Sequence, residues 1–251
     1  MPQLTLKPPY PPRIVFENDD FLVVDKPPFL LSHPTRRNDR PSVLSWLTQE
    51  RNGASFFLAN RLDRETSGLV LVGKDAAAAS ALGRLMEKRL IEKEYLAIVW
   101  GRLACDFLRI DAPLGYIGIS EGNPVAIRQG IRAEGAPAIT VLRSLCSGEE
   151  VSLLRAFPKT GRLHQIRVHL SAIRHPVVGD KIYGPDPNCF LQFAAHGWTP
   201  ELAERLCLNR HALHASRLSF RWQGKEVAVA APLPPDLTGF LRERGIAHHP
   251  A

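Results

Sequence analysis

A charged segment that runs directly into a short apolar stretch is the feature of this sequence that most constrains its fold. Residues 60–72 read NRLDRETSGLVLV. The apolar run at 68–72 is short and rich in Val and Leu, which predicts a buried β-strand, and the charged residues before it predict the loop that leads into this strand. Asp63 would then lie on the loop, with Arg61 and Arg64 on either side of it.

Two interpretations of Asp63 follow from these neighbours. Nearby cations favour the ionised form of a carboxyl group, so we expect Asp63 to be charged. In the first interpretation Asp63 and the arginines form a surface ion-pair cluster that contributes little to stability. In the second, Asp63 is a nucleophile or a base, and one arginine binds an anionic substrate. The pattern alone favours the surface cluster.

Composition indicates a globular protein with a basic surplus. The chain has 251 residues, enough for one large domain or two small lobes, and 45% of them are hydrophobic. The net charge of +7 favours a polyanionic partner such as nucleic acid but does not establish one. The four cysteines are scattered, without the CxxC spacing of a metal site. There is no pattern of a signal peptide and no apolar run of ~20 residues, so we expect a cytoplasmic protein.

Several stretches, in order along the chain, resemble the signatures of pseudouridine synthases of the RluA type, which isomerise uridine in structured RNA. The resemblance extends from about Ile14 to about Pro232. It departs from the common family pattern at Asn60 and Leu163, two positions without an expected chemical role. The matching stretches are DKP at 25–27, HP at 33–34, RLD and TSG at 61–68, EKEYLA at 92–97, KTGRLHQIRVHL at 159–170, and HPVVGD with YG at 175–184.

The resemblance implies an RNA pseudouridine synthase, an isomerase that needs no cofactor and no metal. It implies that Asp63 is the catalytic carboxylate, and it leaves open attack on the base, attack on the sugar, or proton removal. Tyr95 would pack on the target base and assist transfer of the C5 proton; the alternative is a tyrosine in the core of a strand. Arg167 would pair with Asp63 and keep it ionised; the alternative is an arginine on a helix surface.

The implied partner is structured RNA, either rRNA or tRNA, bound by a monomer that contacts no membrane. Arg61 would fill the gap left when the target uridine leaves its stack, or pair with the orphaned base. Arg64 is a further RNA-binding candidate. Arg162 and His164 would contact phosphate or shape their loop. Residues 35–41 carry three arginines and are predicted to form an exposed loop, either solvated or in contact with phosphate.

The predicted fold is α+β, with a mixed, mostly antiparallel central sheet and flanking helices. The resemblance adds two lobes around a basic cleft, as in the pseudouridine synthase fold. We expect an extended, proline-rich tail at 1–13 and a catalytic domain at 14–251, in which 101–135 is a loop-rich insertion or a hairpin. Strands are predicted at 14–16, 21–24, 68–72, 92–100, 138–146, 151–157, 211–222 and 226–230, and helices at 42–50, 75–88, 162–173, 200–206 and 234–244.

Two other functions were weighed against the isomerase. One is an RNA-binding protein on the same fold that recognises or remodels RNA without catalysis. The other is a hydrolase that uses Asp63 and His164, which is disfavoured because the sequence has no nucleophile elbow and no set of metal ligands.

The histidines do not indicate a metal site. The five-residue spacing of His164 and His169 puts them on different faces of a helix, which disfavours metal binding by this pair. His211 and His214 are expected to be structural.

Overall fold

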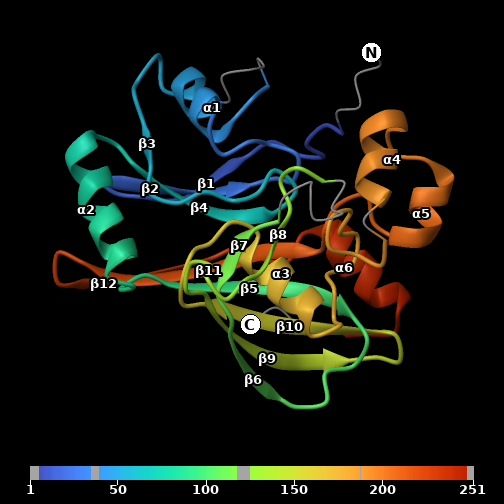
Figure 1. Ribbon diagram of the computed structural model, residues 1–251. Helices are drawn as coiled ribbons and strands as arrows, with labels where there is room; N and C mark the ends of the chain where they lie inside the picture. The colour runs from blue at the N-terminus through green and yellow to red at the C-terminus, as the bar shows by residue number, and fades with distance from the viewer. Residues whose placement is uncertain (1–5, 35–39, 118–124, 187, 248–251) are drawn as a thin grey trace. The chain divides into compact units, whose positions relative to one another are not determined.

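The computed structural model describes residues 6–34, 40–117, 125–186 and 188–247. These residues form two compact units, and the chain passes between them after residues 93, 213 and 232. The 6–93 unit comprises Leu6–Lys93 and His214–Pro232, and the 94–213 unit comprises Glu94–Leu213 and the described residues from Leu233 onwards. Figure 1 traces the chain from blue to red along these segments.

The 6–93 unit is built around β4, the strand that the apolar run predicts. β4 pairs antiparallel with β2 and β3, and parallel with β11, while β1 extends β2 and β12 extends β11 antiparallel. The strands are β1 (Arg13–Glu17), β2 (Phe21–Lys26), β3 (Phe57–Leu58), β4 (Ser67–Gly73), β11 (Leu213–Trp222) and β12 (Lys225–Ala230), and the helices are α1 (Val43–Glu50) and α2 (Ala76–Glu87).

Local sequence explains where both helices of this unit begin. Ser42 caps α1 in a capping box with Ser45, and Asp75 caps α2 by accepting a hydrogen bond from the backbone of Ala78. The apolar side of α2, which includes Leu82, packs on a cluster of buried side chains from β2, β4, β11 and β12. Every residue of β4 is buried, as expected for a strand that is covered on both faces.

The 94–213 unit contains a second run of antiparallel strands, in the order β5-β10-β9-β6, and a separate hairpin of β7 with β8. The strands are β5 (Glu92–Trp100), β6 (Phe107–Asp111), β7 (Leu114–Tyr116), β8 (Gln129–Ile131), β9 (Ile139–Ser147) and β10 (Val151–Pro158), and the helices are α3 (Gln165–Ala172), α4 (Asn188–His196), α5 (Pro200–Leu206) and α6 (Pro235–Glu243).

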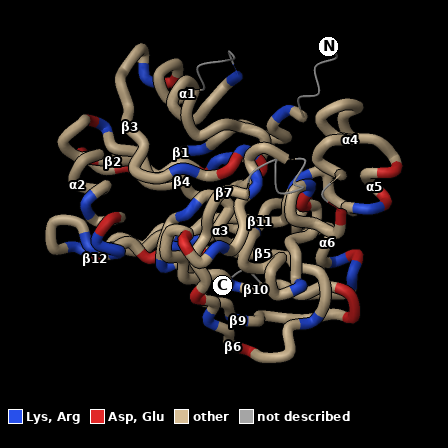
Figure 2. The backbone as a smooth tube through the Cα atoms, in the orientation of Figure 1, with Lys and Arg blue, Asp and Glu red and all other residues tan. Residues whose placement is uncertain are grey.

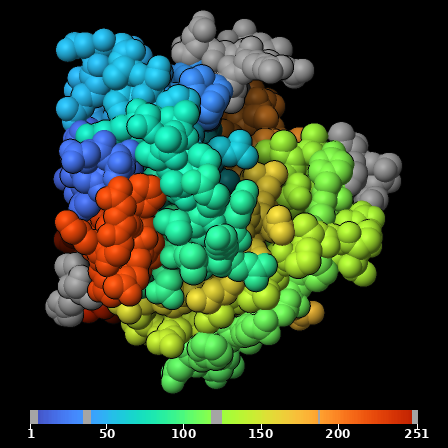
Figure 3. All heavy atoms as spheres, turned by 90° about the vertical axis from the view of Figure 1, so that its left-hand side faces the viewer, coloured from blue at the N-terminus to red at the C-terminus, as the bar shows by residue number. Residues whose placement is uncertain are grey.

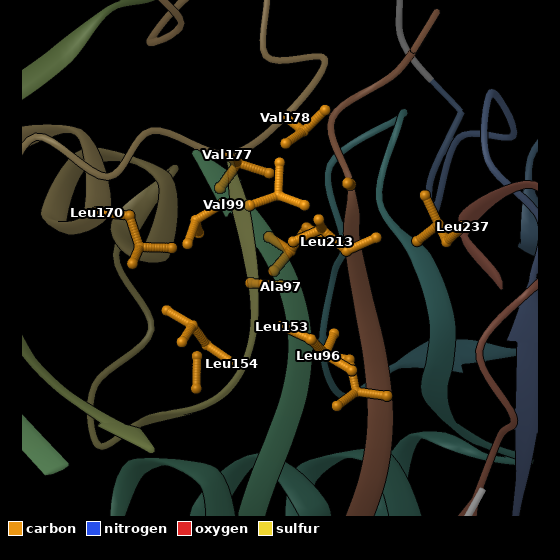
Figure 4. Packing of buried hydrophobic residues seen from close by; sticks show 14 of the residues in the cluster. Leu96, Ala97, Val99, Leu153, Leu154, Leu170, Val177, Val178, Leu213 and Leu237 are labelled. Carbon is orange, nitrogen blue, oxygen red and sulfur yellow. The ribbon is translucent and has the colours of Figure 1, made fainter. Parts of the chain in front are cut away.

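The hydrophobic core of this unit lies on both faces of β5 and β10. Side chains alternate along a strand, so neighbouring residues face opposite sides of the sheet. Figure 4 shows Val99 and Leu154 on the same side as Leu170 of α3. Leu213 of β11 and Leu237 of α6 lie on the other side. The two helices therefore cover opposite faces of one pair of strands.

The α+β class and the mostly antiparallel sheet are confirmed, and most predicted elements lie within a few residues of their expected bounds. Three local predictions were incomplete or wrong. The segment 101–135 contains a hairpin, which was one of its two predicted structures, but it also contributes β6 to the sheet. Helix α4 and the two-residue strand β3 were not predicted. Helix α3 begins at Gln165, three residues later than expected, because His164 adopts a left-handed backbone conformation with φ of 56°.

Basic residues occur on segments of both units, as the blue positions in Figure 2 show. Of the predicted basic loop, residues 35–39 lie outside the described residues, and Arg40 is exposed. Residues 1–5 of the predicted tail also lie outside them. The basic cleft between two lobes and the assignment of 14–251 to one catalytic domain stay predictions.

Candidate active site

The loop that carries Asp63 has its backbone fixed by buried side chains of the same unit. The hydroxyl of Ser32 donates to the carbonyl of Leu62 and accepts from its N–H, both at 3.0 Å. The ammonium group of Lys26, which is fully buried, donates to the carbonyls of Pro27 and Leu30 at 3.0 Å and of Arg64 at 3.3 Å. The residues on both sides of Asp63 are therefore bound, Arg64 by the last residue of β2 and Leu62 by the segment that follows β2.

The start of β4 holds the other end of this loop. Ser67 is buried, and its hydroxyl lies 2.9 Å from Nδ1 of His214 on the neighbouring parallel strand. Nε2 of His214 donates to the carbonyl of Ala231 at 3.2 Å, so in the neutral ring Nδ1 accepts the serine proton. Gly68 has φ of +105°, and a Cβ there would lie 2.2 Å from the carbonyl oxygen of Ala215. Only glycine fits at this position, which is the glycine of the TSG sequence.

Asp63 itself is half-buried, and its carbonyl accepts a hydrogen bond of 3.1 Å from the N–H of Thr66. This turn brings the loop back into β4. A carboxylate on a loop that is anchored at both ends has a defined position at low entropic cost, which is a requirement for a catalytic group.

The two arginines beside Asp63 differ in their surroundings. Arg61 is exposed. The side chain of Arg64 is only 21% exposed, lies with its guanidinium carbon 5.9 Å from the ring centroid of Phe29, and is 3.8 Å from the carboxylate of Glu65. Burial lowers the pKa of Arg64 from its usual value, partly offset by the charge of Glu65. Arg64 therefore has a structural role in its own unit, alongside the predicted contact with RNA.

Tyr95 lies on β5 of the 94–213 unit, opposite Ala156 of β10. It is half-buried and packs against the edge of the main hydrophobic cluster. Because side chains two residues apart share a face, Tyr95 lies on the same face as Val99, which is the face covered by α3. α3 is the helix that carries Arg167, so one predicted catalytic residue lies on this face of the sheet and another lies on the helix that covers it.

Arg167 is held by a buried ion pair that the sequence interpretation missed. The guanidinium group donates from Nε to Oδ2 of Asp180 at 2.7 Å and from Nη2 to Oδ1 at 2.8 Å. Arg167 is 4% exposed and Asp180 is 1% exposed. The alternative of a surface arginine on a helix is therefore wrong. In the sequence, the only signal for Asp180 is the GD dipeptide that follows the helix. Its separation of 13 residues from Arg167 does not by itself indicate a contact.

Asp180 is ionised although it is buried. Burial raises its pKa, but the charge and hydrogen bonds of Arg167 and the backbone N–H groups of Tyr183 and Ile182 outweigh this effect, so its pKa lies below the usual value. Both N–H groups donate to Oδ1 at 3.0 Å. The ring of Tyr183 also lies 5.0 Å from the guanidinium carbon of Arg167. Charge, hydrogen bonds and an aromatic face thus fix the direction of one arginine.

His164 and Arg162 lie just before α3 and contact different parts of the unit. Nδ1 of His164 lies 2.8 Å from the hydroxyl of Tyr183, which accepts from the backbone N–H of Gln129 at 2.8 Å. The tyrosine hydroxyl thus links the histidine ring to the backbone of Gln129. Arg162 is exposed, and its Nε donates to the carbonyl of Pro137 at 3.1 Å. These contacts agree with a role in shaping the loop, and RNA contact by either residue stays a prediction.

The histidines that the sequence left as structural are buried, as expected. His211 is 2% exposed and His214 is 1% exposed. Burial lowers the pKa of His211 far below its usual value, and the nearby cations of Arg167, Lys181 and Arg210 lower it further. Across the described parts of the chain no group of three or more His, Cys, Asp or Glu side chains has the arrangement of a metal site.

Comparison with solved structures identifies the class of protein that this architecture defines. Human RNA Pseudouridylate Synthase Domain Containing 4 matches with a TM-score of 0.73 and 25% identity over 94% of each chain. Human RNA Pseudouridylate Synthase Domain Containing 1 matches with a TM-score of 0.71 and 28% identity over 92% of this chain and 89% of that one. The fold is that of a pseudouridine synthase.

Sequence comparison leads to the same class. The family model for RNA pseudouridylate synthase matches residues 20–172. Ribosomal large subunit pseudouridine synthase D of Nitrosomonas europaea is 34% identical over 95% of this chain and 67% of its own. Dual-specificity RNA pseudouridine synthase RluA of Vibrio vulnificus is 34% identical over 88% of this chain and 82% of its own. The chain belongs to the RNA pseudouridylate synthase family, of the RluA type, and it is an isomerase that acts on RNA.

This assignment decides between the functions predicted from the sequence. The enzyme is favoured over an RNA-binding protein without catalysis and over a hydrolase. None of the described helices combines the length and the apolar composition needed to span a membrane.

Proposed function

We propose that this protein isomerises uridine to pseudouridine at specific positions of structured RNA, either rRNA or tRNA, with Asp63 as the catalytic carboxylate. The observation that carries the proposal is the anchoring of the Asp63 loop, whose neighbouring residues Leu62 and Arg64 are bound by buried Ser32 and Lys26. The name of one relative refers to the large ribosomal subunit, which supports rRNA, and the name of the other describes it as dual-specificity.

The reaction needs a carboxylate and a pocket, and nothing is oxidised or hydrolysed. The bond between N1 of uracil and C1′ of the sugar breaks, the base rotates, and C5 bonds to C1′. The C5 proton leaves and N1 gains a proton, so the product is an isomer of the substrate. In the proposal Asp63 acts at the sugar or the base, and Tyr95 packs on the base and assists removal of the C5 proton.

Arg167 has the role of keeping Asp63 ionised and aimed. Its bidentate bond to Asp180 fixes the plane and the direction of the guanidinium group. A guanidinium group that is already fixed by one carboxylate loses little side-chain freedom when it binds a second anion. The same buried environment strengthens the attraction between opposite charges.

RNA would be held by Arg61, Arg64, Arg162 and His164. Arg61 is the exposed member nearest to Asp63, and it is assigned to the gap that the extruded uridine leaves. If Arg61→Ala turns over a folded RNA as fast as the wild type does, then Arg61 has no such role. The proposed setting is a cytoplasmic monomer that acts without a cofactor.

The experiment is substitution of Asp63 by Asn. Purified variant and wild type are incubated with total RNA from cells that lack the protein, and pseudouridine is mapped in rRNA and tRNA separately. We expect Asp63→Asn to lower turnover by at least about 10²-fold, because an acid–base group contributes 10² to 10⁴, with RNA affinity unchanged. Asp19→Asn, at an exposed carboxylate of the same unit, is the matched control. Turnover by Asp63→Asn equal to that of the control would remove Asp63 from the mechanism.

A further inference from the structure

An open groove of about 780 Å³ lies entirely within the 6–93 unit, beside the loop that carries Asp63. Its wall on one side is residues 56–61, which include β3, and on the other side Ala79 and Ser80 of α2; Leu44 of α1 and His33 complete it. The volume is within the range of about 300–1,000 Å³ that is usual for ligand pockets. Figure 3 shows α2 (green-blue) and the segment around β3 (light blue) next to each other on one face of the molecule.

The lining combines aromatic surface with positive charge. Phe56 and Phe57 both line the groove, and Phe57 is 39% exposed, which is unusual for a phenylalanine. Arg61 is one of the lining residues, and exposed Arg84 donates to the hydroxyl of Ser80 at 2.8 Å on the α2 side. None of the lining residues is an aspartate or a glutamate. Exposed aromatic rings beside cations are the usual means of binding unpaired nucleotides, by stacking and by attraction of the phosphates.

The position along the chain relates this groove to the reaction. Arg61 lines the groove and is two residues from Asp63, so their Cα atoms are at most about 7 Å apart. Stacked nucleotides follow each other at about 3.4 Å in one strand. A strand whose uridine is at Asp63 would therefore bring a nucleotide one or two positions away to the groove.

We propose that this groove binds an unpaired nucleotide that neighbours the target uridine, with its base stacked on Phe57 and its phosphate near Arg61 and Arg84. The inference rests on the proposed role of Asp63 as the site of the reaction. The groove would then select uridines in loops or bulges over uridines within a regular duplex, because only unpaired neighbours have a free base to stack.

The experiment measures binding apart from catalysis. The probes are a fluorescently labelled uridine decamer and a labelled RNA duplex of the same length, titrated with full-length protein. We expect Phe57→Ala to weaken binding of the decamer by about 5–150-fold, the effect of losing one base–aromatic stack, and to weaken the duplex less than twofold. Phe107→Ala removes a 54% exposed phenylalanine in the other unit and is the matched control.

A second variant avoids dependence on a single aromatic side chain. Ser80→Glu adds a negative charge at an exposed position of the groove and should also weaken the decamer selectively. Ala195→Glu adds the same charge at an exposed position of α4 and controls for net charge.

The inference is overturned if the decamer binds Phe57→Ala and Ser80→Glu as tightly as it binds their controls, or if the duplex loses as much affinity as the decamer. Both outcomes are distinct from failure of the proposed function. Asp63→Asn should bind the decamer with unchanged affinity while its formation of pseudouridine falls by at least about 10²-fold. If it forms pseudouridine normally, the proposed function fails, whatever the groove binds.

Discussion

The buried ion pair between Arg167 and Asp180 gives the sharpest prediction about stability. Substitution of Asp180 by Asn keeps the shape of the side chain and leaves an oxygen for the two backbone N–H groups that Oδ1 now accepts from. It removes the negative charge of Asp180, so that Arg167, at 4% exposure, loses the charge of this buried partner and meets an amide in place of one carboxylate oxygen. Removing one partner of a buried pair in this way costs about 3–5 kcal/mol.

Urea unfolding at pH 7, followed by circular dichroism and tryptophan fluorescence, measures this cost. With a denaturant dependence of about 2 kcal/mol per molar, the unfolding midpoint of Asp180→Asn should fall by about 1.5–2.5 M. The control is Asp111→Asn, in which the same change breaks an ion pair with Arg109 whose side chains are 53% and 52% exposed. An exposed pair contributes about 0.2–1 kcal/mol. Equal losses of unfolding free energy in the two variants would refute the argument from burial.

Two further perturbations follow from backbone geometry and from buried histidines. Gly68→Ala should lower the free energy of unfolding by about 2–5 kcal/mol, because its Cβ would meet the carbonyl of Ala215. Gly83→Ala, in open space on α2, should raise the free energy of unfolding by about 0.5–1 kcal/mol. Urea midpoints of the two variants that move in the same direction would contradict this. Burial lowers the pKa of both His211 and His169 in the folded protein. Below about pH 6.5 these two histidines therefore bind protons in the unfolded chain that they do not bind in the folded protein. As the pH is lowered below this value, the free energy of unfolding should decrease by up to about 1.4 kcal/mol per pH unit for each histidine. Melting temperatures between pH 7.5 and 5.5 test this, and a slope in His211→Asn as steep as in the wild type would count against it.

Periodicity and capping residues were sufficient to predict most of the elements. α2 was placed correctly because Asp75 is a good N-cap and the apolar residues after it recur at helical spacing. β5 was predicted from its alternation. β6 was missed because Phe107–Asp111 is a short strand in a segment rich in Gly and Pro, and the start of α3 was misjudged because the left-handed conformation of His164 has no signal in its residue type.

Contacts between distant residues were beyond the sequence. Ser67 and His214 are hydrogen-bonded although 147 positions separate them, and the pairing follows from the parallel register of β4 and β11. The position of Asp63 on a loop before a strand was predicted correctly, yet the buried ammonium of Lys26 that fixes this loop was not. Its side chain is a donor to three backbone carbonyls, and a tripeptide DKP gives no sign of them.

The chain leaves the 6–93 unit after Lys93 and returns to it only at His214. Leu218, Phe220, Val227 and Val229 of the returning segment pack on Phe21, Leu69 and Leu71 from the beginning of the chain. The 94–213 unit also lacks part of its core until Leu237 and Leu241 have been added.

A ribosome that synthesises this protein therefore completes neither hydrophobic core before the segment that follows Leu213 has been translated. Until then the nascent chain carries apolar strands without their final neighbours, a condition that favours aggregation. The interleaved order of its segments therefore couples the completion of one core to that of the other, through the same returning part of the chain.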